Sequence, residues 1–175
     1  MRKALQDYIT TIPDFPKKGI LFRDITSLLQ DGEGFHAAID AILEKLDGVE
    51  FDAVVGLEAR GFLIGAPVAY AAKKGFVPVR KKGKLPRETV SAQYALEYGT
   101  AEVEIHRDSL KQGDRVVIID DLLATGGTLE TAVRLVEQLG GEVVKVISLI
   151  ELTDLNGREK LNGYDVETIL SYSGK

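Results

Sequence analysis

One run of the chain, from Val116 to Thr128, constrains the fold more than any other segment. Four consecutive apolar residues, the pattern of a parallel strand that is buried on both faces, lead into a pair of carboxylates. A loop of small residues follows, and an amphipathic pattern over 128–139 predicts a helix that ends at a glycine pair. This order of strand, short loop and helix indicates one unit of a parallel α/β sheet.

The same alternation recurs along the chain. The segment 60–74, rich in alanine and other apolar residues, predicts a further helix, and Pro78 indicates a strand edge or strand end. We therefore expect an α/β fold, with a central, mostly parallel sheet flanked by helices. The segments predicted to be strands are 52–57, 75–81, 115–120, 142–150 and 166–171.

Two segments lie outside this alternation. Residues 1–35 predict a small N-terminal hood, made of a helix, a proline-containing loop and the approach to a second helix. Residues 82–106 predict a two-stranded flap that turns at Tyr98 and Gly99, and its length as a connection favours a functional role. We interpret residues 1–175 as a single domain, because neither a repeat nor a low-complexity linker divides them.

Charge and composition exclude several classes of protein. The chain has 22 basic and 27 acidic residues and a net charge of −5, which argues against a nucleic-acid or membrane-surface partner. It has no cysteine, which excludes disulfides and thiolate chemistry. Neither a signal peptide nor an apolar run of membrane-spanning length is evident, so we expect a cytoplasmic protein.

The small-residue loop has the properties of a phosphate site. Side chains as small as those of 124–128 let backbone N–H groups approach a phosphate, and the N-terminus of the following helix favours an anion. Asp120 and Asp121 would repel a phosphate unless they bind sugar hydroxyls or a metal ion, which predicts a sugar phosphate with Mg²⁺. The simpler alternative is an ordinary strand-to-helix turn in which an acid caps the helix. The sequence contains neither a P-loop nor a dinucleotide-binding glycine motif.

The run from Val116 to Thr128 resembles the phosphoribosyl-pyrophosphate (PRPP) signature of the type I phosphoribosyltransferases, in the version used by members that act on adenine. Other segments resemble the same family in the same order, so the resemblance covers nearly the whole chain. These segments are 15–25, 56–62, 80–86, 96–99 and 151–161.

The resemblance implies the type I phosphoribosyltransferase fold, with a small hood and a flexible flap. It also implies a reaction of purine salvage, in which adenine and PRPP give AMP and pyrophosphate with Mg²⁺ as cofactor. A homodimer is implied as well. Asp120 and Asp121 would stabilise positive charge on the ribose in the transition state and reach the metal only through water. The residues implied to bind the 5′-phosphate are Ala124, Thr125, Gly126, Gly127 and Thr128.

Two segments are implied to bind the leaving pyrophosphate. The first has a non-proline cis peptide, expected at Glu58–Ala59, and the second is basic and reaches in part into a neighbouring subunit's site. Taken alone, Arg60 would be as well explained as a surface helix residue, and the basic run as a solvated turn. The implied pyrophosphate-binding residues are Glu58, Ala59, Arg60, Arg80, Lys81 and Lys84.

The resemblance further implies an adenine clamp. The backbone of Leu21 and Arg23 would read the edge of the base, while Phe22 and Leu152 would cover its two faces. Glu97 would act as the general acid–base group at adenine N7, and Tyr98 would close over the site and exclude water. Phe22 alone is better explained as a core residue, and the flap residues as an exposed hairpin.

Two alternative functions stay open at this point. A phosphoribosyltransferase for another purine would need a donor to the base's exocyclic oxygen, which the segment 21–23 does not obviously supply. A PRPP-sensing regulator without activity would need a DNA-binding module, for which the chain leaves no room. The chain departs from the family pattern at Arg87, where glycine is expected, and at Ala59, where some relatives carry a hydroxyl.

Overall fold

The computed structural model describes residues 3–96 and 98–174. Within this part of the chain, the main sheet has seven strands in the order β5-β6-β4-β3-β7-β8-β9. They are β3 (Ala53–Leu57), β4 (Gly75–Lys81), β5 (Thr89–Ala95), β6 (Thr100–His106), β7 (Arg115–Leu123), β8 (Glu142–Leu152) and β9 (Val166–Tyr172). Strands β4, β3, β7, β8 and β9 are mutually parallel, and only β5 and β6 run antiparallel to their neighbours. The expected α/β class is therefore confirmed.

Two central strands are longer than their sequences predict. Strand β7 does not end at the carboxylates but continues to Leu123, because its ladder with β8 persists at Leu122 and Leu123. Strand β8 continues to Leu152 for the same reason, since that residue pairs with Tyr172 of β9. The two aspartates thus lie inside the sheet, where hydrogen bonding holds their backbone fixed.

Pro78 lies within β4, which has neighbours on both sides. On one side it pairs with Gly56 of β3. On the other side β6 pairs with β4 only at Arg80 and Lys81, so the missing N–H of Pro78 interrupts no ladder there. Strand β4 is therefore not an edge strand, but at Pro78 its side toward β6 is unpaired, as at a sheet edge.

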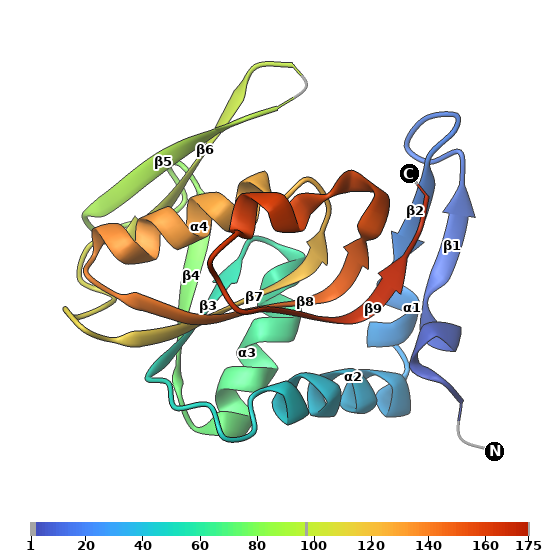
Figure 1. The fold of residues 1–175 in the computed structure, drawn as a ribbon, viewed down its shortest axis with the longest axis horizontal. Helices are drawn as coiled ribbons and strands as arrows, with labels where there is room; N and C mark the ends of the chain where they lie inside the picture. Colours follow the sequence, from blue (N-terminus) through green and yellow to red (C-terminus); the bar gives the residue numbers. More distant parts are fainter. Residues whose placement is uncertain (1–2, 97, 175) are drawn as a thin grey trace.

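Helices cover both faces of the sheet (Figure 1). Helix α4 (Gly127–Gln138) packs on one face with the flap strands, and its buried residues include Leu129, Leu135 and Val136. Helices α2 (Gly32–Lys45) and α3 (Arg60–Ala72) cover the other face. Two apolar cores therefore hold β3, β7 and β8 between them, and the central strands have the continuous apolar sequences that this burial requires.

The N-terminal segment forms a separate two-stranded sheet of β1 (Thr10–Pro13) and β2 (Leu21–Asp24), preceded by the short helix η1 (Leu5–Tyr8) and followed by α1 (Thr26–Leu29). Strands β5 and β6 form a hairpin that extends from the opposite end of the main sheet (Figure 1). Two short 3₁₀ helices, η2 (Thr153–Leu155) and η3 (Gly157–Leu161), connect β8 to β9. None of the described helices is both long and apolar enough to cross a membrane.

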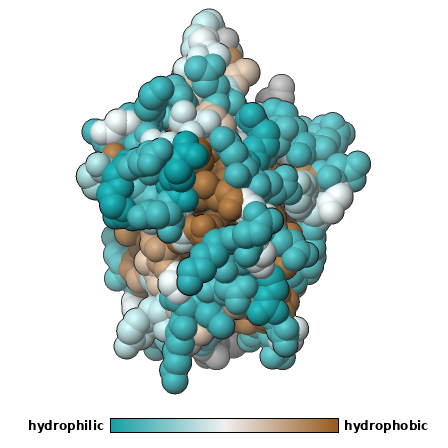
Figure 2. All heavy atoms as spheres, turned by 90° about the vertical axis from the view of Figure 1, so that its left-hand side faces the viewer, coloured by the Kyte–Doolittle hydropathy of each residue, from teal (hydrophilic) through white to brown (hydrophobic). Residues whose placement is uncertain are grey.

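The surface on the flap side is mostly hydrophilic, and an apolar patch near the middle of this face is framed by hydrophilic residues (Figure 2). The carboxyl ends of β3, β7 and β8 lie between the hood and the flap (Figure 1). Ligands of open α/β sheets bind at such carboxyl ends, so the fold directs attention to this edge.

Candidate active site

The floor of the site is the end of β7. Asp120 and Asp121 are 8% and 6% exposed, although both are acidic. The Asp120 Oδ1 accepts a hydrogen bond of 2.9 Å from the backbone N–H of Asp121, and the Asp121 Oδ2 lies 2.8 Å from Nε of Arg60 at the start of α3. The two carboxylates therefore have different partners: Asp120 contacts a backbone N–H group, and Asp121 contacts the Arg60 guanidinium.

The two carboxyl groups therefore have different electrostatic environments. Burial raises the pKa of Asp120 well above its ordinary value, and the adjacent Asp121 carboxylate raises it further. Arg60 opposes the increase, but it pairs directly with Asp121 rather than with Asp120. A buried acid pair with unequal partners at the end of a strand is typical of a functional site.

A polar cavity of about 330 Å³ lies above the aspartates. The first turn of helix α4 lies in its wall, and Gly126, with φ +87°, forms the N-cap of the helix in a left-handed conformation that favours glycine. Of the residues predicted to bind the 5′-phosphate, Gly127 is the one that does not line the cavity. The cavity-lining residues from this loop and helix are Ala124, Thr125, Gly126, Thr128 and Leu129.

The loop after β3 closes the second side of this cavity through Glu58, Ala59 and Arg60. The peptide bond between Glu58 and Ala59 is cis, as the resemblance implied. Glu58 accepts hydrogen bonds from Arg80 Nε at 2.9 Å and from the Lys81 N–H at 3.2 Å. Burial acts to raise the pKa of Glu58, but these hydrogen bonds and the nearby positive charges lower it below its ordinary value.

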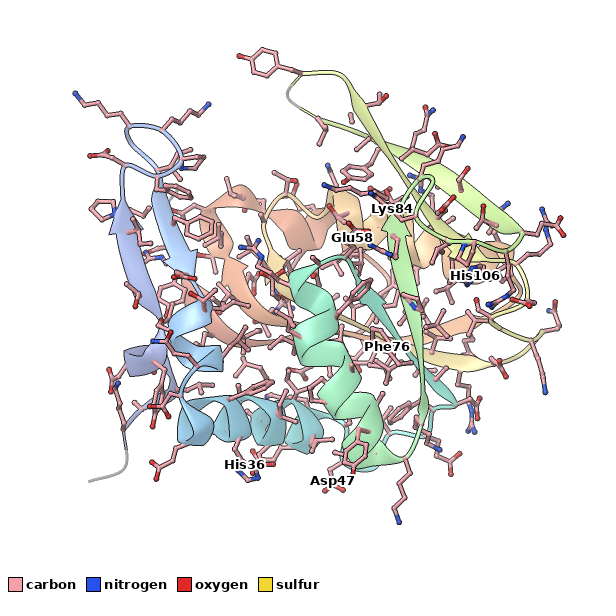
Figure 3. All side chains as sticks on the ribbon, turned by 180° about the vertical axis from the view of Figure 1, so that it is seen from behind. His36, Asp47, Glu58, Phe76, Lys84 and His106 are labelled. Atoms are coloured by element: carbon pink, nitrogen blue, oxygen red, sulfur yellow. The ribbon has the colours of Figure 1, made fainter. Side chains whose placement is uncertain are left out.

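The basic segment lies beside the cavity rather than in its wall. Arg80, Lys81 and Lys84 are not among the described residues that line it. Arg80 is held against Glu58, and Figure 3 shows Glu58 and Lys84 on the same side of the molecule, near the end of β4. The structure thus brings three of the predicted pyrophosphate residues to the cavity and leaves the other three next to it.

A second, more apolar cavity of about 640 Å³ lies under the hood. All four residues predicted to bind adenine line it, namely Leu21, Phe22, Arg23 and Leu152. Phe22 packs edge-on against Phe15 at 5.1 Å between ring centroids, and the Arg60 guanidinium lies 5.7 Å from the Phe22 ring. The two cavities meet, because the same three residues, Arg60, Asp121 and Leu122, line both of them.

Sequence reasoning missed several residues of these walls. Tyr94 of β5 lines the polar cavity, and alternation along β5 gave a signal for it, since Val90 and Ala92 share its face. Leu122, Ile150 and Leu155 line the apolar cavity, where their sequence pattern indicates only core packing. Their role as wall residues depends on where the strands end relative to the hood.

The flap is anchored at its base. The buried Glu104 of β6 accepts hydrogen bonds from the N–H groups of Gly83 and Leu85 and from the hydroxyl of Thr89. At the tip, Tyr98 is 86% exposed and contacts neither cavity, while the predicted acid–base residue Glu97 lies outside the described residues.

Neither histidine belongs to the site. His36 lies on α2, 3.4 Å from Asp40, on the side of the molecule away from Glu58 and Lys84 (Figure 3). His106 is buried at the end of β6, where its Nε2 accepts a hydrogen bond from the Arg87 N–H at 3.3 Å. Neither histidine lines either cavity.

Comparison with known proteins identifies the class of protein that carries this site. A family model described as the phosphoribosyl transferase domain matches residues 26–171, and the chain belongs to this family. Its similar relatives are adenine phosphoribosyltransferases. That of Agathobacter rectalis is 60% identical over 173 residues, and that of Lachnoclostridium phytofermentans is 58% identical over 173 residues; each match covers 99% of both chains.

Solved structures agree with this placement. The adenine phosphoribosyltransferase of Thermoanaerobacter pseudethanolicus is 54% identical, with a TM-score of 0.93 over 96% of this chain and 98% of that one. The Saccharomyces cerevisiae enzyme is 42% identical, with a TM-score of 0.92 over 95% and 96% of the two chains. That structure holds adenine together with an imino-altritol bisphosphate.

Proposed function

We propose that this chain is an adenine phosphoribosyltransferase of purine salvage, which joins adenine to PRPP and gives AMP and pyrophosphate. The observation that carries the proposal is the junction of the two cavities at Arg60 and Asp121. A polar cavity suits the sugar phosphate, an apolar one suits the base, and the reacting bond lies where they meet. Relatives with this name at 58% and 60% identity support the same activity.

The 5′-phosphate would bind to the loop Ala124–Thr128. Its small side chains expose backbone N–H groups, and the positive end of the α4 dipole favours an anion there. Asp120 and Asp121 would hydrogen-bond to the ribose hydroxyls, with the carboxylate oxygens as acceptors. Bound in this way, the sugar would have its anomeric carbon facing the apolar cavity.

Adenine would bind under the hood. The backbone N–H and C=O groups of Leu21 and Arg23 complement the acceptor and donor pattern on the edge of the base, and Phe22 and Leu152 would cover its faces. Because β2 belongs to the hood and Leu152 to the main sheet, the base would bind between two parts of the fold. Leu122 and Leu155 complete the apolar wall.

In the reaction, the N9 lone pair of adenine forms a bond to the anomeric carbon. The bond from that carbon to the pyrophosphate oxygen breaks, and the imidazole proton of adenine is released. Positive charge develops on the ribose ring, and the Asp121 carboxylate stabilises it most where the charge is greatest, in the transition state. Assignment of the proton acceptor to Glu97, and of site closure to Tyr98, stays a prediction.

Pyrophosphate would leave along the loop of Ala59 and Arg60. Arg80, Lys81 and Lys84 lie beside this path rather than in the wall, which is consistent with a role completed by a second subunit. We include a homodimer in the proposal on this basis. A cytoplasmic location remains a prediction.

Magnesium is also part of the proposal. Mg²⁺ keeps several waters and binds proteins through one or two carboxylates together with substrate phosphates. The described residues contain no group of three or more histidine and acidic side chains placed to hold a metal, and the carboxylates at the cavity are Asp120, Asp121 and Glu58, of which Glu58 is already paired with Arg80. This donor set fits a hydrated ion carried mainly by PRPP, which would neutralise charge on the leaving pyrophosphate.

One assay tests the function. The protein is incubated with PRPP, Mg²⁺ and, separately, adenine, hypoxanthine, guanine, xanthine or orotate, and release of pyrophosphate is measured. We expect release with adenine and little with the other bases. No release with adenine would overturn the proposal, release with another purine would reassign the base, and PRPP binding without turnover would favour a regulator.

A further inference from the structure

The segment after β8 lies directly against the phosphate loop. Gly157, the first residue of η3, packs so closely on the loop that a Cβ there would collide with the Ala124 carbonyl oxygen and lie 3.1 Å from the Gly126 nitrogen. In the other direction, a Cβ on Gly126 would collide with the Gly157 carbonyl oxygen. The backbone of 157 therefore forms the outer support of the loop proposed to hold the 5′-phosphate.

The same segment forms part of the apolar cavity. Leu152 at the end of β8 and Leu155 in η2 both line it. Between Leu155 and Gly157 the chain turns at Asn156, whose φ of 53° is left-handed. Residues 152–157 thus connect the wall of the base cavity to the support of the phosphate loop, although they belong to neither β7 nor α4.

Short 3₁₀ helices have little stability of their own, so this connection needs an anchor. Arg158 provides one. Its Nε and Nη2 donate to the two carboxylate oxygens of Glu151 at 2.8 and 3.0 Å, in the paired geometry that fixes both distance and orientation. Its Nη1 donates to the Val166 carbonyl at 2.9 Å, and Nη2 also reaches the Thr168 hydroxyl at 3.2 Å.

Glu151 is fixed in turn. It is 7% exposed, accepts a third hydrogen bond, from the Thr168 hydroxyl at 3.0 Å, and pairs in the sheet with Leu123, the residue before the phosphate loop. Burial acts to raise the pKa of Glu151, but Arg158 and Thr168 lower it below its ordinary value, which keeps the charge that the pair requires. Arg158 therefore ties η3 to both β8 and β9.

The geometry assigns to Glu151 and Arg158 a positioning role: the pair fixes the segment 152–157 so that Gly157 supports the phosphate loop and Leu152 and Leu155 form the wall of the base cavity. Neither side chain lines either cavity among the described residues, so the pair acts through the backbone that it anchors. This inference rests on the proposed function for the identity of the two ligands.

The pair has a matched control at the other edge of the sheet. Arg115 at the start of β7 makes a fork-shaped pair with Asp52, at 3.1 Å from both Nε and Nη2. It lies at the amino end of the strand whose carboxyl end carries the aspartates, so it contacts no part of the site. Arg115→Gln therefore removes a similar interaction without touching the connection.

The experiment compares Arg158→Gln, Arg158→Lys and Arg115→Gln with the parent protein. Dissociation constants are measured by calorimetry for ribose 5-phosphate and for AMP, melting temperatures by circular dichroism, and KM and kcat for PRPP and adenine in the pyrophosphate assay. We expect Arg158→Gln to weaken the binding of both ligands and to raise both KM values about tenfold, with kcat changed less than twofold. Arg158→Lys, which keeps the charge but not the fork, should be intermediate.

Arg115→Gln should lower the melting temperature while leaving all binding constants at parent values. Parent-like binding in Arg158→Gln, or equal losses of binding in Arg158→Gln and Arg115→Gln, would overturn the inference. Because ribose 5-phosphate binding needs no turnover, these outcomes differ from a failure of the proposed function, in which the parent itself releases no pyrophosphate with adenine. If Arg158→Gln fails to fold, Thr168→Val, which removes one partner of the pair, should give a smaller shift in the same direction.

Discussion

The two cavities that meet at Asp121 are built in different ways. The polar cavity comes almost entirely from two strand-to-helix junctions, 58–60 and 120–129, with Tyr94 as its one contribution from elsewhere among the described residues. The apolar cavity combines residues 17–25 of the hood with the ends of β7 and β8 and with Leu155. A phosphate is bound by backbone groups that one loop can supply, whereas a flat apolar base needs side chains from two facing surfaces.

The difference extends to electrostatics. The polar cavity carries buried carboxylates, a raised pKa at Asp120 and the Arg60 pair, while the apolar one is lined mostly by apolar side chains, with Lys17 and Arg23 as its charged residues away from the border. We therefore expect substitutions in the polar cavity to affect catalysis and the pH dependence of stability. Substitutions in the apolar cavity should affect base binding alone.

The largest effect is expected at the junction. Asp121→Asn removes the charge that stabilises the developing cation and pairs with Arg60, so kcat/KM should fall about a hundredfold or more. The melting temperature should change little, because the asparagine keeps the shape of the side chain. Steady-state kinetics and thermal melting measure the two. Matching losses of activity and stability would instead make Asp121 a structural residue.

The second largest effect is expected for Gly126→Ala, because it combines an unfavourable φ with a collision against the Gly157 carbonyl. We expect a loss of about 2 kcal/mol in the free energy of unfolding, together with weaker ribose 5-phosphate binding. Gly163→Ala is the control, since its φ is +92° but nothing lies within 4 Å of the added carbon. Urea unfolding and calorimetry compare them, and equal losses in both variants would show that the contact with Gly157 contributes nothing.

A smaller effect is expected in the apolar cavity. Leu152→Ala removes part of the wall that would cover adenine, and KM for adenine should rise about fivefold, in line with the loss of roughly 1 kcal/mol of apolar contact. KM for PRPP serves as the internal control and should stay at the parent value. A rise in KM for PRPP alone would contradict this assignment and place Leu152 at the PRPP site.

The smallest effect concerns pH and stability. The pKa of Asp120 is raised in the folded state, so its contribution to stability is complete below the ordinary aspartate pKa and is lost as pH rises through the raised value. Asp120→Asn should therefore be more stable than the parent at pH 7, and the difference should vanish near pH 4. Urea unfolding from pH 4 to pH 8 measures it. Parallel stability curves for the two proteins would show that Asp120 is not strained by burial.

Much of the polar cavity could be predicted from sequence. The run 116–128 predicts a buried strand, a small-residue loop and a helix start, and local physics alone requires these three features to be adjacent. The extension of β7 through Asp120 and Asp121 to Leu123 could not be predicted, because it depends on pairing with β8. Sequence placed the aspartates at a strand end, and the sheet holds them inside a strand.

The apolar cavity was predicted only through family resemblance. Phe22 and Leu152 are 130 positions apart in the numbering, and no local pattern indicates that they face one cavity. Leu122, Ile150 and Leu155 look like core residues in sequence, because an apolar wall and an apolar core have the same composition. Likewise, the numbering alone does not show that Arg158 returns to Glu151 and supports the loop at Gly126.

The sequence by itself determined the βα alternation, the phosphate loop and the charges at its edge, because these depend on neighbours along the chain. Only the tertiary structure decided which strand ends meet, how Arg60 and Asp121 join two cavities, and where residues 152–158 lie against the loop. These features depend on contacts between distant segments, and such contacts are fixed by the packing of the whole sheet between its two cores.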